Sequence, residues 1–271
     1  MRASSVILFL IALGLGYAMW DRLVDSAIFQ PARGVAVTPA QLGIAAEDVY
    51  LETEDGVRIH AFYLPAPESQ LALLFLHGNA GNASHRLPNA AELVRLGCSV
   101  LLLDYRGYGL SEGRPSESGA YADARAGLAH LIDQRGFPED RVIVFGRSLG
   151  GAVAVDLARD RELAGVILES TFTSAADIAR GLGGAWLGAL AGHRFDSASK
   201  IDRIRAPLLF FHGDRDEVID YALGRRLFDA APEPKSFETI SGAGHNNTTQ
   251  VGGRPYFERI RRFLDEVSGA S

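Results

Sequence analysis

The sequence predicts an α/β fold in which helices cover both faces of a mostly parallel sheet. Short apolar runs alternate with helix-length segments along most of the 271 residues, and strands that alternate with helices usually pair in parallel. The runs are apolar at nearly every position, as expected for strands buried on both faces. Because 47% of the residues are hydrophobic, the chain can bury one sizeable core. We therefore expect a single α/β domain.

The predicted domain begins with an antiparallel hairpin. Residues 48–53 and 57–64 alternate between apolar and polar side chains, and the turn sequence at residues 54–56 separates them. The predicted parallel strands follow at residues 71–76, 100–104, 142–145, 165–168, 208–211 and 236–240. The last element is an amphipathic helix, because residues 256–267 place their large apolar side chains on one helical face.

A serine lies where a predicted strand turns sharply into a helix. The strand at residues 142–145 leads into Gly146-Arg147-Ser148-Leu149-Gly150, and a helix-like stretch follows. This context is typical of a nucleophile elbow, since small residues on either side of the serine let strand and helix approach closely. The other interpretation is a glycine-rich helix start in which Ser148 only caps the helix.

Two downstream loops contain the partners that a nucleophilic serine requires. Serine becomes reactive when a base takes its proton and an acid orients that base. We interpret Asp216, after the strand at residues 208–211, as the acid, and its neighbour Asp214 as a turn residue. His245, in a loop of small residues after the next strand, is the predicted base. The order Ser148, Asp216, His245 is the one expected for a nucleophile-elbow hydrolase.

Attack on a carbonyl also requires donors for the developing oxyanion. The backbone N–H of Leu149 follows the nucleophile at a helix N-terminus, where the dipole favours negative charge. The second donor is predicted to be the backbone N–H of Asn79, in the small-residue loop after the strand at residues 71–76. The alternative for that loop is an ordinary Gly/Asn turn.

We expect no metal, no organic cofactor and no nucleic-acid partner. The sequence contains neither H-E-x-x-H nor C-x-x-C, and its one cysteine is Cys98. His77 and His212 each precede a glycine after an apolar run, which favours hydrogen bonds within a loop. A net charge of -6 without a basic, aromatic-rich patch argues against nucleic acid. Nothing in the pattern indicates the oligomeric state.

The motifs also resemble those of a known family. The segments HGNAGNASHRLPNA, LLLDYRGYGLSEG, FGRSLGGAVA, HGDRDEVID and GAGHNN occur in this order and cover most of the chain. They resemble the membrane-anchored α/β-hydrolase-domain proteins of the subgroup numbered thirteen and, more loosely, of the subgroup numbered seventeen. The resemblance implies the α/β-hydrolase fold and a triad of Ser148, Asp216 and His245, with Asn79 and Leu149 at the oxyanion. The second subgroup implies removal of fatty acyl groups from protein cysteines.

The N-terminus predicts a membrane anchor. Residues 3–20 carry no charge and as a helix would span about 27 Å at about 1.5 Å per residue, close to the hydrocarbon thickness of about 30 Å. We therefore expect a single-pass anchor over residues 1–28 that contacts membrane lipid, with Arg2 inside and the catalytic domain on the non-cytoplasmic side. The alternative is a cleaved signal segment and secretion. A linker at residues 29–46 and the hydrolase domain at residues 47–271 complete the predicted organisation.

A small cap is expected at residues 170–206, where hydrolases of this fold insert one. Its centre is rich in Gly, Ala, Leu and Trp, and Trp186, Leu187 and Leu190 are candidates for lining an acyl pocket. The other interpretation is a glycine-rich helix packed against the sheet. Near the strand at residues 100–104, we expect Asp104 and Arg106 to form a structural ion pair.

Together these features predict a serine hydrolase that cleaves carboxylic esters or thioesters, including those of fatty acyl groups, through an acyl-enzyme at Ser148. The same machinery cleaves amides, so a serine peptidase or amidase is the alternative within catalysis. A third interpretation is a non-catalytic, membrane-bound binding protein that has kept the fold.

Overall fold

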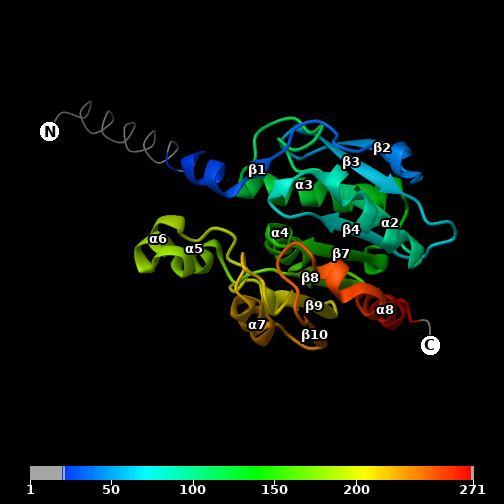
Figure 1. Ribbon diagram of the computed structural model, residues 1–271. Coiled ribbons are helices and arrows are strands. Elements are labelled where there is room, and N and C mark those ends of the chain that lie inside the picture. Colours follow the sequence, from blue (N-terminus) through cyan, green and yellow to red (C-terminus); the bar gives the residue numbers. More distant parts are fainter. Residues whose placement is uncertain (1–19, 21, 270–271) are drawn as a thin grey trace, which may run out of the picture.

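An eight-stranded sheet forms the centre of the protein in the computed structural model, which describes residues 20 and 22–269 (Figure 1). The strand order is β10-β9-β8-β7-β4-β6-β3-β2. All neighbours pair in parallel except β2 with β3 and β3 with β6, so the predicted N-terminal hairpin is confirmed. The strands are β2 (Glu47–Glu52), β3 (Arg58–Leu64), β4 (Ala72–Leu76), β6 (Ser99–Leu103), β7 (Val142–Arg147), β8 (Gly165–Glu169), β9 (Leu208–Gly213) and β10 (Lys235–Ile240).

Helices cover both faces of the sheet and create two apolar cores. Residues of α3, α4 and α7 pack in one core, and residues of α2 and α8 pack in the other. The α-helices are α2 (Leu87–Arg95), α3 (Glu117–Ala129), α4 (Leu149–Ala158), α5 (Ala175–Gly183), α6 (Ala185–Ala191), α7 (Tyr221–Ala230) and α8 (Thr248–Ser268). Single helical turns are η1 (Ala40–Leu42), η2 (Ala83–Arg86), η3 (His130–Gln134), η4 (Glu139–Arg141) and η5 (Ile201–Arg203).

The burial of each strand follows its sequence pattern. Every residue of β4, β6, β7 and β8 is buried, as their continuous apolar runs predict. The edge strand β2 instead buries Val49 and Leu51 and exposes its other four residues. In α8, Tyr256, Ile260 and Phe263 are buried on one helical face, in agreement with the predicted periodicity.

The parallel strands carry the functional loops to a single edge of the sheet. The carboxyl end of β7 leads directly into Ser148, while β4, β9 and β10 lead into the loops that contain Asn79, Asp216 and His245. Carboxyl ends of neighbouring parallel strands meet at one edge, where open α/β sheets bind their ligands. Loops that are separated along the chain therefore converge there.

The predicted single-pass anchor is corrected by the structure. Within residues 20 and 22–269, none of the helices combines the length and the apolar character needed to span a bilayer. The remaining residues of the predicted anchor or signal segment, 1–19 and 21, lie outside the described residues. Residues 22–28 are helical, and together with Trp20 we call them the flanking helix, which is blue in Figure 1. It lies at the same end of the sheet as α5 and α6.

The segment after the flanking helix packs against the core of the domain. Phe29 is buried and packs edge-on against Tyr108 and Phe195. The short strand β1 (Gln30–Pro31) pairs in parallel with β5 (Ala80–Gly81), within the loop that carries Asn79. Residues 29–31 therefore connect the flanking helix directly to a functional loop.

The region after β8 forms two short helices rather than one. Helix α5 begins at an N-cap in which the Ser174 side chain accepts a hydrogen bond from the Asp177 backbone N–H. Gly184, in a left-handed conformation with φ 85°, separates α5 from α6. Glycine adopts this conformation without a steric penalty, and it lets the two helices fold back against each other.

Candidate active site

Ser148 occupies a strained turn between β7 and α4. Its φ is 54°, in the left-handed region that residues with a side chain rarely adopt. A Cβ placed on Gly146 would lie 2.3 Å from the Gly150 carbonyl oxygen, and one on Gly150 would lie 2.0 Å from the Leu76 carbonyl oxygen. Only glycine fits at either position, so the nucleophile-elbow interpretation of this turn agrees with its geometry.

The three residues predicted to form a triad lie in one hydrogen-bonded chain. His245 Nε2 is 3.0 Å from Ser148 Oγ, and His245 Nδ1 is 2.8 Å from Asp216 Oδ2. Both distances are within the range in which a base activates a nucleophile and an acid orients the base. All three side chains are largely shielded from solvent, which strengthens the electrostatic interactions among them.

The surroundings of Asp216 favour its ionised form. Burial opposes ionisation, but hydrogen bonds from His212, His245 and the Ile219 backbone N–H outweigh burial, so the pKa of Asp216 is held well below its ordinary value. The other oxygen, Oδ1, accepts from the backbone N–H groups of Val218 and Ile219 at 3.0 and 2.8 Å. Asp216 is thus fixed as a hydrogen-bond acceptor for His245.

Asp214 has the structural role of a turn residue. Its carboxylate accepts hydrogen bonds from the Ser241 hydroxyl, at 3.1 Å, and from the Gly242 backbone N–H, at 2.6 Å. These contacts join the loop after β9 to the loop after β10. Asp214 therefore braces the two loops that carry Asp216 and His245.

Asn79 and Leu149 flank Ser148 on the wall of one cavity. Leu149 is the first residue of α4, and the first backbone N–H groups of a helix have no partner within it. The Asn79 carbonyl accepts from the Tyr108 hydroxyl at 2.6 Å, and its side chain donates to the Ile28 carbonyl oxygen at 2.7 Å. These bonds hold Asn79 through its carbonyl and side chain rather than through its backbone N–H.

A buried ionic network behind the triad was not predicted from the sequence. Arg147 Nε donates to Glu169 Oε1 at 2.9 Å, and Arg147 Nη2 donates to the His245 carbonyl oxygen at 2.6 Å. Glu169 also accepts from the hydroxyls of Thr248, at 2.6 Å, and Tyr256, at 2.5 Å. The network therefore joins the elbow, β8, the His245 loop and α8. Its one sequence signal is a charged residue, Arg147, inside an otherwise apolar and glycine-rich run.

We expect Arg147→Lys to lower kcat about tenfold, while KM stays near the wild-type value. A lysine keeps the charge opposite Glu169, but it lacks the forked donor that also reaches the His245 carbonyl. His245 would then be less precisely held, and small misplacements of catalytic groups cost rate rather than binding. Steady-state kinetics at several pH values, with the melting temperature measured in parallel, check this. A wild-type kcat would show that Arg147 does not position His245.

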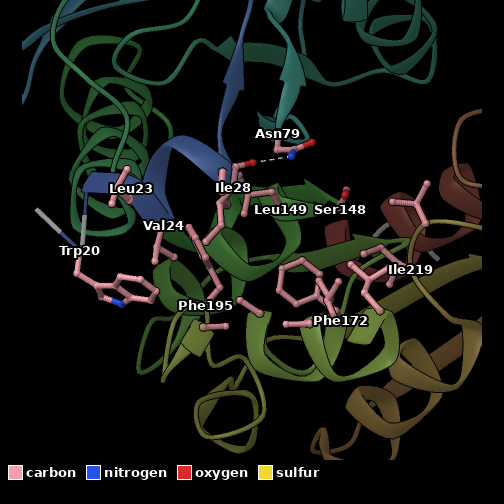
Figure 2. Close-up of a pocket in the computed structure, with 17 residues that line it drawn as sticks. Trp20, Leu23, Val24, Ile28, Asn79, Ser148, Leu149, Phe172, Phe195 and Ile219 are labelled. Carbon is pink, nitrogen blue, oxygen red and sulfur yellow. Dashed lines mark hydrogen bonds between the residues drawn. The ribbon is translucent and has the colours of Figure 1, made fainter. Parts of the chain in front are cut away.

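An apolar cavity of about 580 Å³ opens beside Ser148 (Figure 2). Its volume lies within the usual range of small-molecule sites. Within the described residues its lining contains no charged side chain, and its polar members are Ser148 and Asn79. The rest of the lining is apolar and consists of Trp20, Leu23, Val24, Ala27, Ile28, Leu149, Phe172, Ala175, Ile178, Ala179, Leu182, Ala191, Phe195, Val218 and Ile219.

The cavity only partly matches the pocket predicted from the sequence. Its wall includes residues of α5, within the expected cap. Trp186 of α6, a predicted pocket residue, does not line it and is 65% exposed. The side chains of Leu187 and Leu190 lie outside the described part of the structure. The flanking helix contributes five lining residues that lie within the predicted anchor of residues 1–28. Their apolar spacing along residues 20–28 is the sequence feature that could have indicated this role.

The remaining titratable groups near the site have structural partners. His77 Nδ1 lies 2.6 Å from the Gly78 carbonyl oxygen and His212 Nε2 lies 3.0 Å from the Ile219 carbonyl oxygen, as their loop positions predict. The prediction of an ion pair between Asp104 and Arg106 is wrong. Asp104 instead faces His60 and His77, and Arg106 pairs with Asp55 and Asp123. Across the described residues, no cluster of His, Cys, Asp or Glu has the arrangement of a metal site.

The chain is similar to proteins from several kingdoms. The family model described as serine aminopeptidase, S33, matches residues 67–199. The uncharacterized protein Rv2307c of Mycobacterium tuberculosis is 39% identical, over 96% of this chain and 93% of its own length. The alpha/beta hydrolase domain-containing protein WAV2 of Arabidopsis thaliana is 35% identical, over 93% and 91%. Protein bem46 of Schizosaccharomyces pombe is 34% identical, over 97% and 91%.

Solved structures share the fold over most of the chain. One crystal form of the Pyrococcus furiosus esterase Pf2001 superposes with a TM-score of 0.73 at 25% identity, and covers 88% of this chain and 99% of its own. An alpha-beta hydrolase from Vibrio vulnificus superposes with a TM-score of 0.69, also at 25% identity, and covers 80% and 81%. These similarities confirm the predicted α/β-hydrolase fold.

Proposed function

Because the chain belongs to the α/β-hydrolase domain-containing family, with WAV2 and bem46 among its relatives, we propose that it is a serine hydrolase that releases apolar acyl groups from carboxylic esters or thioesters. The observation that carries this proposal is the position of Ser148, which lies on the wall of a cavity otherwise lined almost entirely by apolar side chains. An acyl chain in that cavity would place its carbonyl carbon beside the Ser148 hydroxyl.

The proposed reaction has two acyl-transfer steps. His245 takes the proton of Ser148 as the hydroxyl attacks the carbonyl carbon, and Asp216 holds the imidazole in the orientation that exposes Nε2 to the serine. The tetrahedral oxyanion accepts hydrogen bonds from the backbone N–H groups of Leu149 and Asn79. His245 then protonates the leaving alcohol or thiol. Water, deprotonated by His245, releases the carboxylic acid and restores Ser148.

An aminopeptidase is the second candidate, because the matching family model carries that description. An aminopeptidase must bind the cationic amine at the start of its substrate, and burial of an unpaired charge is costly. Among the described lining residues of the cavity beside Ser148, none is acidic. This lining favours an uncharged acyl group over a free amine.

A panel of an octanoyl ester, octanoyl thioesters and aminoacyl anilides tests the proposal. The purified protein is expected to hydrolyse p-nitrophenyl octanoate and octanoyl thioesters with kcat/KM at least about a hundredfold above that for aminoacyl p-nitroanilides, because an apolar cavity cannot compensate a buried ammonium. Hydrolysis of the aminoacyl anilides alone would support the peptidase instead. The ratio of kcat/KM for the ester to kcat/KM for the thioesters then identifies the preferred leaving group.

A further inference from the structure

We propose that the flanking helix forms one wall of the acyl site, and that Leu23, Val24 and Ile28 determine which acyl chains fit. This inference rests on the proposed function and assigns acyl selection to a segment outside the central sheet and the helices that cover it. It is carried by three independent features of the helix: the spacing of its lining residues, its attachment to the active-site loops and its exposure along the cavity.

The lining residues occupy one face of the flanking helix. Trp20, Leu23, Val24, Ala27 and Ile28 all line the cavity, and their spacing of i, i+3, i+4, i+7 and i+8 is that of a single helical stripe. The residues between them in the sequence are polar: Asp21, Arg22, Asp25 and Ser26. The helix is therefore amphipathic, with its apolar face turned toward the space beside Ser148. Figure 2 shows Ile28, Val24 and Trp20 at successive distances from Ser148.

The C-terminal end of the flanking helix is attached to the loop expected to stabilise the oxyanion. The Asn79 side chain donates to the Ile28 carbonyl oxygen, one of the last helix carbonyls, which lack partners within the helix. The next residue, Phe29, is 4% exposed and packs against Phe195, which also lines the cavity. Ile28 is thus held at a defined position close to the reaction centre.

An ion pair joins the polar side of the flanking helix to the segment after α6. Asp25 pairs with Arg194 across 169 positions of the chain, and both side chains are mostly buried. Arg194 follows Ala191, another lining residue of the cavity, by three positions. The pair therefore ties the flanking helix to a second segment next to the cavity.

Exposure differs among the large lining residues of the flanking helix. Ile28 and Val24 are partly buried, whereas Trp20 is 42% exposed and Leu23 is 61% exposed. From residue 28 to residue 20 the helix axis advances about 12 Å, at about 1.5 Å per residue. The cavity thus follows the helix over about two turns, and Leu23 and Trp20 are more exposed along it than Ile28 and Val24. Short acyl groups would contact Ile28, and longer ones would also contact Val24 and Leu23.

Matched phenylalanine substitutions on the two faces of the helix test this inference. The readout is the ratio of kcat/KM for p-nitrophenyl decanoate to that for p-nitrophenyl acetate, measured on the full chain. Val24→Phe narrows the cavity, and we expect it to lower this ratio about tenfold, mainly through KM, as for a misfit in an apolar pocket. Ser26→Phe adds the same ring on the polar face and is expected to leave the ratio at the wild-type value.

A second variant keeps the test decisive if Val24→Phe fails to fold. Leu23 is mostly exposed, so Leu23→Ala should fold like wild type, and loss of its contact with the end of a long chain should lower the ratio about threefold. Equal ratios in wild type, Val24→Phe, Leu23→Ala and Ser26→Phe would overturn the inference while leaving the esterase function intact. Absence of ester and thioester hydrolysis in wild type would instead overturn the proposed function and, with it, this inference.

Discussion

Ser148→Ala is expected to lower kcat for ester hydrolysis by about a millionfold and to abolish covalent labelling by a fluorophosphonate probe. The Ser148 hydroxyl lies on the cavity wall within hydrogen-bond reach of His245 Nε2, so its removal eliminates the acyl-enzyme. Any hydrolysis that remains would come from oxyanion stabilisation and binding alone. Intact-protein mass spectrometry after incubation with the probe measures the adduct directly.

Ser170→Ala is the matched control for this substitution. Ser170 follows β8, is fully buried and has a φ of 48°, close to the 54° of Ser148. Its hydroxyl makes no hydrogen bond to any residue that the structure describes. We expect Ser170→Ala to be labelled like wild type. Persistent labelling of Ser148→Ala, or its loss in Ser170→Ala alone, would contradict the assignment of Ser148 as nucleophile.

Asp216→Asn is expected to lower kcat by about ten-thousandfold while changing KM little. An asparagine amide can donate to His245 Nδ1 where the carboxylate accepts, which would stabilise the tautomer that carries its proton on Nε2 and cannot take one from Ser148. Asp214→Asn is the control, because Asp214 bonds Ser241 and Gly242 rather than the histidine. A larger kcat loss in Asp214→Asn than in Asp216→Asn would reverse the two roles.

The same variant has a pH-dependent effect on stability. Hydrogen bonds from His212, His245 and Ile219 lower the folded pKa of Asp216 below its unfolded value of about 3.9. The stability contributed by the ionised carboxylate is therefore complete above that unfolded value and is lost as the pH falls toward the folded pKa. Urea unfolding at pH 7 and at pH 3.5 should show a larger difference between wild type and Asp216→Asn at pH 7.

Much of the fold could be predicted because its determinants are local. The apolar runs that became β4 and β7 are long enough for one strand each and are flanked by glycine or polar loops. Parallel pairing followed from the helices between them. The elbow could also be predicted, because the close approach of strand and helix requires glycine at positions 146 and 150, within one five-residue segment.

Partners of buried charges could not be predicted in the same way. Asp104 and Arg106 are two positions apart in the chain, yet Asp104 contacts His60 and His77, and Arg106 contacts Asp55 and Asp123. A buried charge pairs with whatever oppositely charged or hydrogen-bonding group the packing brings near it. Proximity in sequence carries little information about that choice.

By itself, the sequence determined the α/β sheet, the serine in its elbow and the order of Ser148, Asp216 and His245. Each depends on apolar periodicity, on glycine sterics or on chemistry attached to a recognisable strand end. Tertiary structure alone decided what surrounds Ser148. The apolar stripe of residues 20–28 has the same composition whether it faces lipid or protein, and burial depends only on which apolar surface meets it. In the structure the stripe lines the cavity beside Ser148, together with residues of α5 and Phe195.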